Sequence, residues 1–469
     1  MTAEVMAQEE TQAAEVVAVA VAVAEPQKEK DAEENVEPRE PSSVDETKPK
    51  TVEKSSSYKE ESNYLSDLKE FERKALSELK SKLEEAILGN TLFDPKKEAL
   101  PENEEKKNEG EEKEEEEEKK VEVEENDVSI WGVTLLPSKG AEGVDVVLLK
   151  FLRAREFKVN DAFEMLKKTL KWRKESKIDS VVDEDFGSDL ASAAYMNGVD
   201  HEGHPVCYNI FGAFESEESY QKTFGTEEKR SEFLRWRCQL MEKGIQRLNL
   251  KPGGVSSLLQ INDLKNSPGP SKLRVATKQT LAMFQDNYPE MVAKNIFINV
   301  PFWYYALNAL LSPFLTQRTK SKFVVARPNK VTETLTKYIP IEEIPVHYGG
   351  FKRENDSEFS SQDVAVSELI LKAGSTATIE IPALEVGYSL CWDLTVLGWE
   401  LSYKEEFVPT DEGSYTVIVQ KGKKMGSQEG PVRNTFRNNE PGKVVLTIEN
   451  TSNKKKKVLY RYKSIKSSF

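Results

Sequence analysis

The chain has 469 residues, which is enough for two or three domains. Residues 1–127 contain 39 acidic and 19 basic residues, a net charge of −20, and the remainder contains 47 basic and 42 acidic residues, a net charge of +5. Three cysteines without motif spacing argue against a disulfide framework and favour a reducing compartment. The acidic start does not resemble a secretory signal, and no apolar stretch reaches the ~20 residues of a membrane span. These features predict a cytoplasmic protein whose membrane contacts are peripheral.

Residues 1–127 are dominated by Glu, Lys, Pro and Ser and are predicted to form a disordered acidic tail. Between about 64 and 88, however, apolar residues recur at helical spacing, and a glycine follows them. They are Leu65, Leu68, Phe71, Leu76, Leu79, Leu83 and Ile87. This pattern predicts an amphipathic helix that docks on a partner or on the folded domain, or that forms only transiently.

The next two regions have different periodicities. Residues 128–190 show helical stripes of apolar residues, and residues 191–352 alternate between helical and strand patterns. The expected strands of the second region are Val206–Phe211, Ser256–Leu264, Asn295–Val300 and Lys322–Ala326, and a long helix is expected at Glu227–Leu248. Such alternation predicts an α/β domain with a mostly parallel sheet.

Residues 360–469 contain seven short alternating runs separated by Gly, Pro, Asn and Asp. This texture predicts an all-β sandwich. The fold class is therefore multidomain: a disordered acidic tail, an α-helical plus α/β domain, and a β-sandwich.

No catalytic constellation is recognisable, so we do not expect an enzyme. The only histidines are His201, His204 and His347, and the first two flank a turn without further metal ligands in sequence. Neither a phosphate-binding glycine loop nor a serine nucleophile elbow is present. Asp263 ends a buried strand, where it could act as a lone acid but more simply caps a turn before Lys265.

Three segments have features of a lipid site. Arg153 and Arg155 lie beside an apolar helical stripe, and the turn 286–290 ends in a carboxylate that could accept bonds from sugar-like hydroxyls. The run 301–315 is apolar almost all round and precedes a cationic cluster, as the lid of an acyl-chain cavity requires, although a core helix beside a surface loop would look the same.

The C-terminal 55 residues, from Tyr415, carry 13 basic and 3 acidic residues, a net charge of +10. The densest part is Lys454, Lys455, Lys456 and Lys457, which we expect to attract anionic membranes. Nucleic acid is not an expected partner, because no stacking platform or reading helix accompanies the cluster.

The order of several motifs resembles the CRAL-TRIO lipid-transfer family over about 220 residues. They are L-R-A-R-E-F at 152–157, D-H-E-G-H-P-V at 200–206, I-N-D-L at 261–264, N-Y-P-E at 287–290, I-N-V-P-F at 298–302 and I-P-V-H-Y-G-G at 344–350. The final region resembles a GOLD domain, with G-S-Y-T-V at 413–417 and N-T-S-N-K-K-K-K-V-L-Y-R-Y at 450–462. An acidic tail followed by these two domains looks like the patellins of plants.

The resemblance implies that one phospholipid, phosphatidylinositol or a phosphoinositide, is enclosed between a sheet and a mobile helical gate, without any other cofactor. It implies headgroup contacts by Arg155, Glu290, Thr319 and Lys322, residue types that suit a phosphate and ring hydroxyls. The gate helix and acyl cavity would involve Phe302, Trp303, Tyr304, Leu307, Leu310, Leu311 and Phe314.

The match departs from the family at the phosphatidylcholine site. Leu258 and Gln260 stand where the family has Ser and Thr, which disfavours phosphatidylcholine, and Glu156 replaces a frequent basic residue. The implied function is a lipid carrier or sensor in membrane trafficking at the plasma membrane, or at the cell plate during plant cytokinesis. The alternative is a trafficking scaffold whose GOLD domain and acidic tail recruit proteins, with the bound lipid structural.

Overall fold

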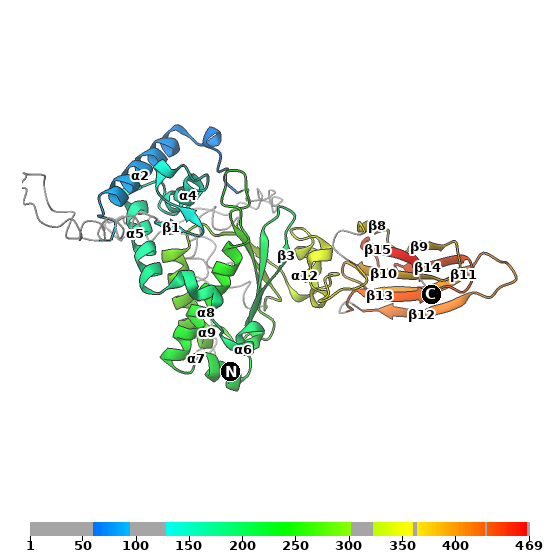
Figure 1. Cartoon of the computed structure of the whole chain (residues 1–469). Coiled ribbons are helices and arrows are strands. Elements are labelled where there is room, and N and C mark those ends of the chain that lie inside the picture. The colour runs from blue at the N-terminus through cyan, green and yellow to red at the C-terminus, as the bar shows by residue number, and fades with distance from the viewer. Residues whose placement is uncertain (1–59, 94–127, 302–321, 360–363, 427–428, 467–469) are drawn as a thin grey trace, which may run out of the picture.

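The computed structural model describes residues 60–93, 128–301, 322–359, 364–426 and 429–466. Most of the predicted acidic tail therefore lies outside the described residues. In the described part, a group of helices lies at one end, a five-stranded sheet in the middle and a β-sandwich at the other end (Figure 1).

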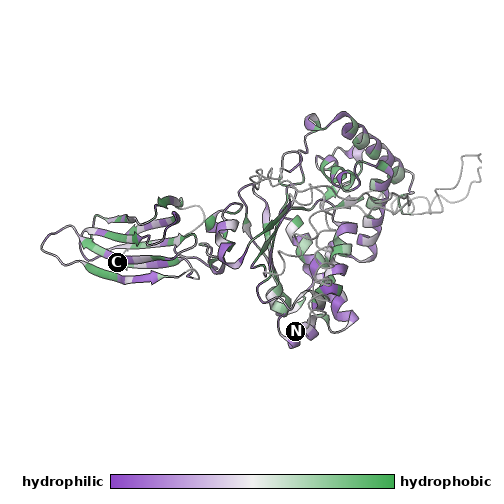
Figure 2. Ribbon diagram, turned by 180° about the vertical axis from the view of Figure 1, so that it is seen from behind, coloured by the Kyte–Doolittle hydropathy of each residue, from purple (hydrophilic) through white to green (hydrophobic). Residues whose placement is uncertain are grey.

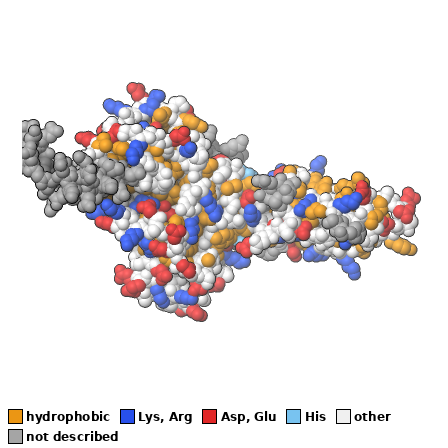
Figure 3. All heavy atoms as spheres, viewed as in Figure 1, with side chains coloured by type: hydrophobic (Ala, Val, Ile, Leu, Met, Phe, Trp, Pro, Cys, Tyr) orange, Lys and Arg blue, Asp and Glu red, His pale blue; other side chains and the backbone are white. Residues whose placement is uncertain are grey.

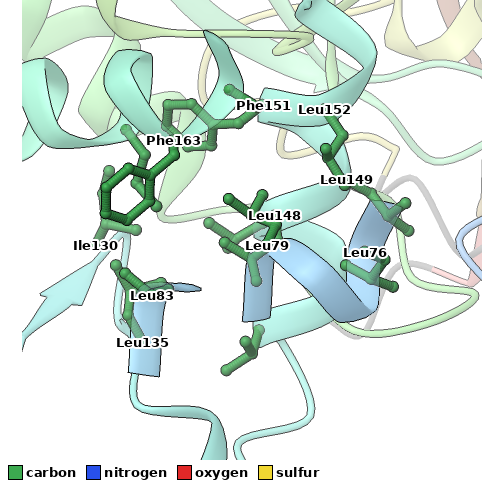
Figure 4. Close-up of a cluster of buried hydrophobic side chains, with 14 of the residues drawn as sticks. Leu76, Leu79, Leu83, Ile130, Leu135, Leu148, Leu149, Phe151, Leu152 and Phe163 are labelled. Atoms are coloured by element: carbon green, nitrogen blue, oxygen red, sulfur yellow. The ribbon is translucent and has the colours of Figure 1, made fainter. Parts of the chain in front are cut away.

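The helical end of the molecule includes the amphipathic segment that the sequence left without an assigned contact. Its elements are α2 (Glu70–Leu88), the hairpin of β1 (Ser129–Ile130) and β2 (Val133–Thr134), α4 (Val144–Ala154) and α5 (Val159–Glu175). Helix α2 packs against both α4 and α5. Its apolar residues recur every three or four positions, so Leu76, Leu79 and Leu83 share one buried face. Figure 4 shows Leu76 and Leu79 near Leu148 and Leu149 of α4, and Leu83 near Leu135. Helix α2 is thus docked on the folded part of this chain.

The central sheet has the order β3-β4-β5-β6-β7. Its strands are β3 (Ala194–Val199), β4 (Pro205–Ile210), β5 (Leu258–Asp263), β6 (Val292–Ile298) and β7 (Phe323–Val325). Strands β4 to β7 are parallel, and β3 is antiparallel to β4. The accompanying helices are α6 (Gly187–Ala191), α7 (Glu217–Phe224), α8 (Glu227–Ile245), α9 (Pro270–Asn287) and α12 (Val331–Leu335). The predicted α/β domain with a mostly parallel sheet is confirmed.

Strand β5 separates two different environments. Successive side chains of a strand point to opposite faces. Leu259 and Ile261 pack with Leu335 and other apolar residues of the segment that follows β7. Gln260 and Asn262 face the opposite way, toward α8 and α9. One face of the sheet is therefore an apolar core, and the other carries amides.

The C-terminal region is a sandwich of two antiparallel four-stranded sheets, ordered β13-β10-β15-β8 and β12-β11-β14-β9. The strands are β8 (Ser367–Leu371), β9 (Thr376–Ala383), β10 (Tyr388–Val396), β11 (Leu401–Pro409), β12 (Val417–Met425), β13 (Val432–Arg437), β14 (Gly442–Glu449) and β15 (Lys456–Lys466). Trp392, Tyr403 and Phe407 are buried between the sheets. The predicted sandwich is confirmed, with β13 as a strand that its polar sequence concealed. Figure 2 shows alternating hydrophobic and hydrophilic segments along these strands.

A buried network of charges joins the sandwich to the segment that precedes it. The carboxylate of Asp393 on β10 accepts bonds from Arg353 at 2.9 Å, from Arg461 at 2.8 Å, and from two nitrogens of Arg433 at 2.8 and 2.6 Å. Arg433 also makes a bidentate pair with Asp356 at 2.6 and 2.8 Å. Since Arg353 and Asp356 precede the sandwich, these bonds orient it relative to the central sheet.

We expect Leu79→Ala to lower the free energy of unfolding by about 2–5 kcal/mol, because it leaves a cavity in a core that α2 completes. Urea unfolding of the full chain measures this difference. Leu88→Ala is the control, because Leu88 lies on the same helix with 61% of its surface exposed and should change stability by less than about 0.5 kcal/mol. Equal effects would contradict the docking of α2.

Candidate functional site

A polar residue stands at the start of each of the four parallel strands. These residues are His204 before β4, Ser257 before β5, Glu290 before β6 and Lys322 before β7. Because parallel neighbouring strands begin at one edge of a sheet, the four side chains line that edge. We call it the strand-start edge.

Two of the predicted headgroup residues form an ion pair at the strand-start edge. The ammonium of Lys322 lies 2.9 Å from a carboxylate oxygen of Glu290. The ammonium of Lys150, on α4, donates a bond of 2.8 Å to the backbone carbonyl of Glu290. Lys150 is only 2% exposed, and its burial lowers its pKa to about 8 although Glu60 and Glu290 act in the opposite direction. A buried cation and an ion pair thus meet at one turn.

The other predicted headgroup residues are placed differently. Arg155 caps the C-terminus of α4, is half-buried, and donates a bond of 3.1 Å to the neighbouring carbonyl of Ala154. In the described part of the chain it makes no ion pair with Glu290. Thr319 and the seven predicted residues of the gate and cavity, from Phe302 to Phe314, lie outside the described residues. Three of the four predicted headgroup residues are therefore described, and two of these, Glu290 and Lys322, are in contact.

Residues 60–64, which we call the strap, cover the strand-start edge. Arg153 is the main anchor: it lies 2.9 Å from the Glu61 carboxylate and donates bonds of 2.6 Å to the Asn63 side chain and to the Ser62 carbonyl. Asn63 is buried and donates to the hydroxyl of Ser256 at 3.3 Å. The first arginine of the L-R-A-R motif is therefore engaged by the chain's own acidic segment.

Glu60 of the strap binds two residues of the same edge. Its carboxylate accepts a bond of 2.6 Å from Ser257 and lies 3.1 Å from His204 Nε2, while His204 Nδ1 lies 2.9 Å from Asp200. Burial opposes charge on both groups, but the bonds to His204 and Ser257 lower the pKa of Glu60 to about 2. The bonds to Asp200 and Glu60 raise the pKa of His204 to about 9. These residues, with their described neighbours, do not form a group that could hold a metal ion.

A cavity of about 160 Å³ lies on the amide-bearing face of the sheet, between the sheet and helices α8 and α9. Its walls are mostly apolar, with Phe233 and Trp236 from α8 and Phe284 from α9. Leu258 and Gln260 stand where the family has the Ser and Thr of its phosphatidylcholine site. Gln260 lines the cavity, and Leu258 is buried in a separate apolar cluster. The walls of the cavity suit an apolar group.

The four C-terminal lysines do not form one exposed cluster. Lys454 and Lys455 are exposed in the turn before β15. Lys456 is only 9% exposed and donates a bond of 3.1 Å to the carbonyl of Gly398, and Lys457 pairs with Glu368 at 2.8 Å. On the face seen in Figure 3, the cations of the sandwich lie among acidic and hydrophobic side chains. Of the four lysines, Lys454 and Lys455 are thus the two in the exposed class. Among the described residues, no helix combines the length and hydrophobicity needed to cross a bilayer.

Sequence reasoning missed Lys150, Glu60 and the role of His204. Lys150 interrupts an apolar run on α4. This position could have predicted a buried lysine, because its neighbours on both sides are buried. For Glu60 the sequence offers no signal, because its contacts are made 144 and 197 residues away.

We expect Glu60→Ala to lower the free energy of unfolding by about 1–3 kcal/mol at pH 6, because it deprives buried Ser257 and His204 of a charged acceptor. The raised pKa of His204 stabilises the fold below pH 6.5, and this contribution is lost as the pH rises through about 9. The lowered pKa of Glu60 stabilises it above pH 4.5, and this contribution is lost as the pH falls through about 2. The effect of the substitution should therefore shrink at pH 10.

Urea titrations at pH 6 and pH 10 measure this pH dependence, with Glu78→Ala, an exposed site on α2, as the control. An equal loss of stability at both pH values would show that the strap is not held by the charge on His204.

Comparison with known proteins finds three family matches along the chain. Residues 75–168 match the N-terminal domain of the CRAL/TRIO family, residues 191–350 match the CRAL/TRIO domain, and residues 372–456 match the C-terminal GOLD domain of Patellin-1-like proteins. The first match begins inside α2, in agreement with the packing of this helix on α4 and α5.

Individual relatives cover most of the chain. Patellin-4 of Arabidopsis thaliana is 55% identical over 99% of this chain and 99% of its own length, and Patellin-3 is 47% identical over 87% and 77%. The phosphatidylinositol transfer protein SFH5 of Kluyveromyces lactis is 29% identical over 52% of this chain and 81% of its own length. Identity of this degree along nearly the whole of both chains shows that the protein is a member of the patellin family.

Proposed function

We propose that this chain is a peripheral membrane protein that carries or senses one phosphoinositide molecule, with the headgroup at the strand-start edge and the acyl chains on the cavity face of the sheet. The observation that carries the proposal is the Lys322–Glu290 pair beside buried Lys150. Lysine suits a phosphate, and a carboxylate accepts bonds from ring hydroxyls. Arg155 and Thr319 are proposed as further headgroup contacts.

The relatives support a lipid ligand. The yeast relative is named as a phosphatidylinositol transfer protein, and its similarity covers 52% of this chain. We propose the same class of ligand here, with action at cytoplasmic membranes in trafficking, at the plasma membrane or at the cell plate of dividing cells.

The energetics of exchange place selectivity in the headgroup. Burying a diacyl lipid with roughly 30 methylenes gains on the order of 24 kcal/mol, but the bilayer supplies nearly the same gain, so exchange of the chains is almost neutral. A charge-assisted hydrogen bond contributes about 1.5–3 kcal/mol. A few contacts from Lys322, Glu290 and Lys150 are therefore enough to select one headgroup.

Catalysis is not part of the proposal. Asp263, the one candidate acid, accepts bonds from the Tyr348 hydroxyl at 2.7 Å, the Asn299 amide at 2.7 Å and the Lys265 backbone N–H at 2.9 Å. These bonds connect the end of β5 to the segment after β6 and to Tyr348. Asp263 thus has a structural role at the end of β5.

We expect Lys322→Ala and Arg155→Ala each to lower phosphatidylinositol binding at least about tenfold, because each removes a cation from the phosphate site. Transfer of labelled phosphatidylinositol between vesicles measures this, and phosphatidylcholine, expected to transfer poorly, is the comparison lipid. Lys330→Ala is the matched control, since Lys330 lies at the surface and pairs with Glu333. Wild-type binding by both site variants would refute the headgroup assignment.

We expect Lys454→Ala with Lys455→Ala to weaken binding to anionic vesicles by about 2 kcal/mol at low salt, because each exposed lysine near such a surface contributes about 1 kcal/mol. Deleting residues 1–59 should strengthen binding, since it removes acidic charge and stops short of the strap and α2. Both effects should fade as salt increases.

Vesicle flotation across a salt series decides this second test. Lys456→Met is the control, because that lysine is buried against Gly398 and should affect stability more than membrane binding. Unchanged flotation of both the double variant and the deletion would remove support for the electrostatic mechanism.

A further inference from the structure

The cavity beside α8 and α9 has an unusually polar sheet face. The residues of β4, β5 and β6 that line it include four carboxamides, Asn209, Gln260, Asn262 and Asn295. Acyl chains require no hydrogen-bonding groups, and buried amides are costly unless they are bonded. The composition of this face therefore points to a polar group of the ligand.

Arg237 of α8 brings a positive charge into this cavity. Its side chain is half-buried and lines the cavity. Its Nη1 donates a bond of 2.7 Å to the side-chain oxygen of Asn209, and its guanidinium lies 5.7 Å from the ring centres of Trp236 and Phe284. Burial lowers the pKa of Arg237, but a guanidinium stays protonated in proteins.

Two buried cations of the described chain, Arg173 and Lys150, differ from Arg237 because carboxylates lie near them. Arg173 pairs with Glu242 at 2.6 Å, and Lys150 experiences the charges of Glu60 and Glu290. Arg237 makes no ion pair with any described carboxylate, and its Nε and Nη2 make no hydrogen bond to a described residue. A charge in an apolar site calls for a counter-ion.

The amides beside Arg237 are already ordered. The Asn209 side-chain nitrogen donates to the Gln260 oxygen at 2.8 Å and to the Asn262 oxygen at 3.2 Å. Asn262 thus uses its oxygen within the protein, and its NH₂ group makes no bond to a described residue. Arg237 and Asn262 therefore offer N–H donors to a ligand. The Asn209 oxygen does not, because it is an acceptor that already accepts a bond from Arg237. Such a set favours an acceptor with negative charge.

We propose that Arg237 and the carboxamides of β4 and β5 form a second polar site, inside the cavity, that binds the carboxylate or phosphate of an anionic amphiphile. The site is separate from the strand-start edge: Asn209 and Asn262 are paired near the far ends of their strands. From Ser257 to Asn262 the chain advances by about 16 Å at the usual rise of a strand. A choline head would place a second cation beside the guanidinium, so it is disfavoured there. The inference rests on the proposed function, because it requires that the cavity holds a lipid.

The test compares loading of the full chain from vesicles doped with one of four lipids of matched acyl chains. Oleic acid supplies a carboxylate, dioleoyl phosphatidic acid a phosphate, dioleoylglycerol neither, and dioleoyl phosphatidylinositol reports the strand-start edge. The variants are Arg237→Met, Arg237→Lys and Asn262→Leu. Lys243→Met is the control, because it removes a like charge from the exposed side of the same helix. Bound lipid is quantified by mass spectrometry after gel filtration.

We expect Arg237→Met to reduce loading of oleic acid, phosphatidic acid or both at least about tenfold, without a change for dioleoylglycerol. The lipid that responds identifies carboxylate or phosphate as the group bound. Arg237→Lys should retain part of the preference, and Lys243→Met all of it. If Arg237→Met does not fold, Asn262→Leu and Arg237→Lys must still lower anionic loading selectively.

Two outcomes overturn the inference, and they are distinguishable. The cavity site alone is refuted by the following pair of results. The wild type and the Arg237 and Asn262 variants load both anionic lipids equally, and Lys322→Ala still loses phosphatidylinositol. Failure of the wild-type chain to load any of the four lipids refutes the proposed function, and the cavity site with it.

Discussion

Strand β5 is the constraint on which the rest of the α/β part depends. It is buried along its whole length, and it pairs in parallel with β4 on one side and β6 on the other. Because side chains alternate, one strand must satisfy two environments. Leu259 and Ile261 complete an apolar core, and Gln260 and Asn262 give the other face its amides. Shifting the register by one residue would bury the amides in the core and expose apolar side chains to the cavity. The cavity and the core are therefore fixed by the same six residues.

Most elements could be predicted because their signals are local. Strand β10 was expected at 388–396 and is found there, because a mainly apolar run stands between Gly387 and Gly398. Strand β13 was missed because its sequence, V-R-N-T-F-R, is polar; it is held in the sheet by pairing with β10. The contact of α2 was left open for a similar reason. Its stripe predicts a helix with an apolar face, but which surface covers that face is decided by α4 and α5.

The sites were harder to predict, because they depend on contacts distant in sequence. Lysine is rarely buried, so Lys150 in an apolar run was overlooked, although its neighbours mark it as internal. The strap joins residues near position 60 to His204 and Ser257, and no periodicity encodes such a contact. The alternation of side chains along a strand could have predicted which of the lysines at 454–457 is buried. Strand β15 begins at Lys456, whose side chain points inward, and the next side chain, Lys457, points toward the surface.

The cations of the strand-start edge and Arg237 differ in what a bound anion must displace. At the edge, Lys322 is paired with Glu290, and Arg153 is held by the strap. An anion entering there competes with carboxylates that the protein supplies, so a ligand with a phosphate alone gains little. A ligand that also carries hydroxyls can pair its phosphate with Lys322 and donate hydrogen bonds from its hydroxyls to the released Glu290. Replacing the Lys322–Glu290 pair by these contacts then conserves the number of hydrogen bonds. The proposed headgroup site at the edge thus favours a polyhydroxylated phosphate over a simple one. Arg237 has no described carboxylate to displace, so charge alone is sufficient in the cavity. The two proposed sites therefore differ in the chemistry of selection: the edge reads the combination of groups on the ligand, and the cavity reads the sign of its charge.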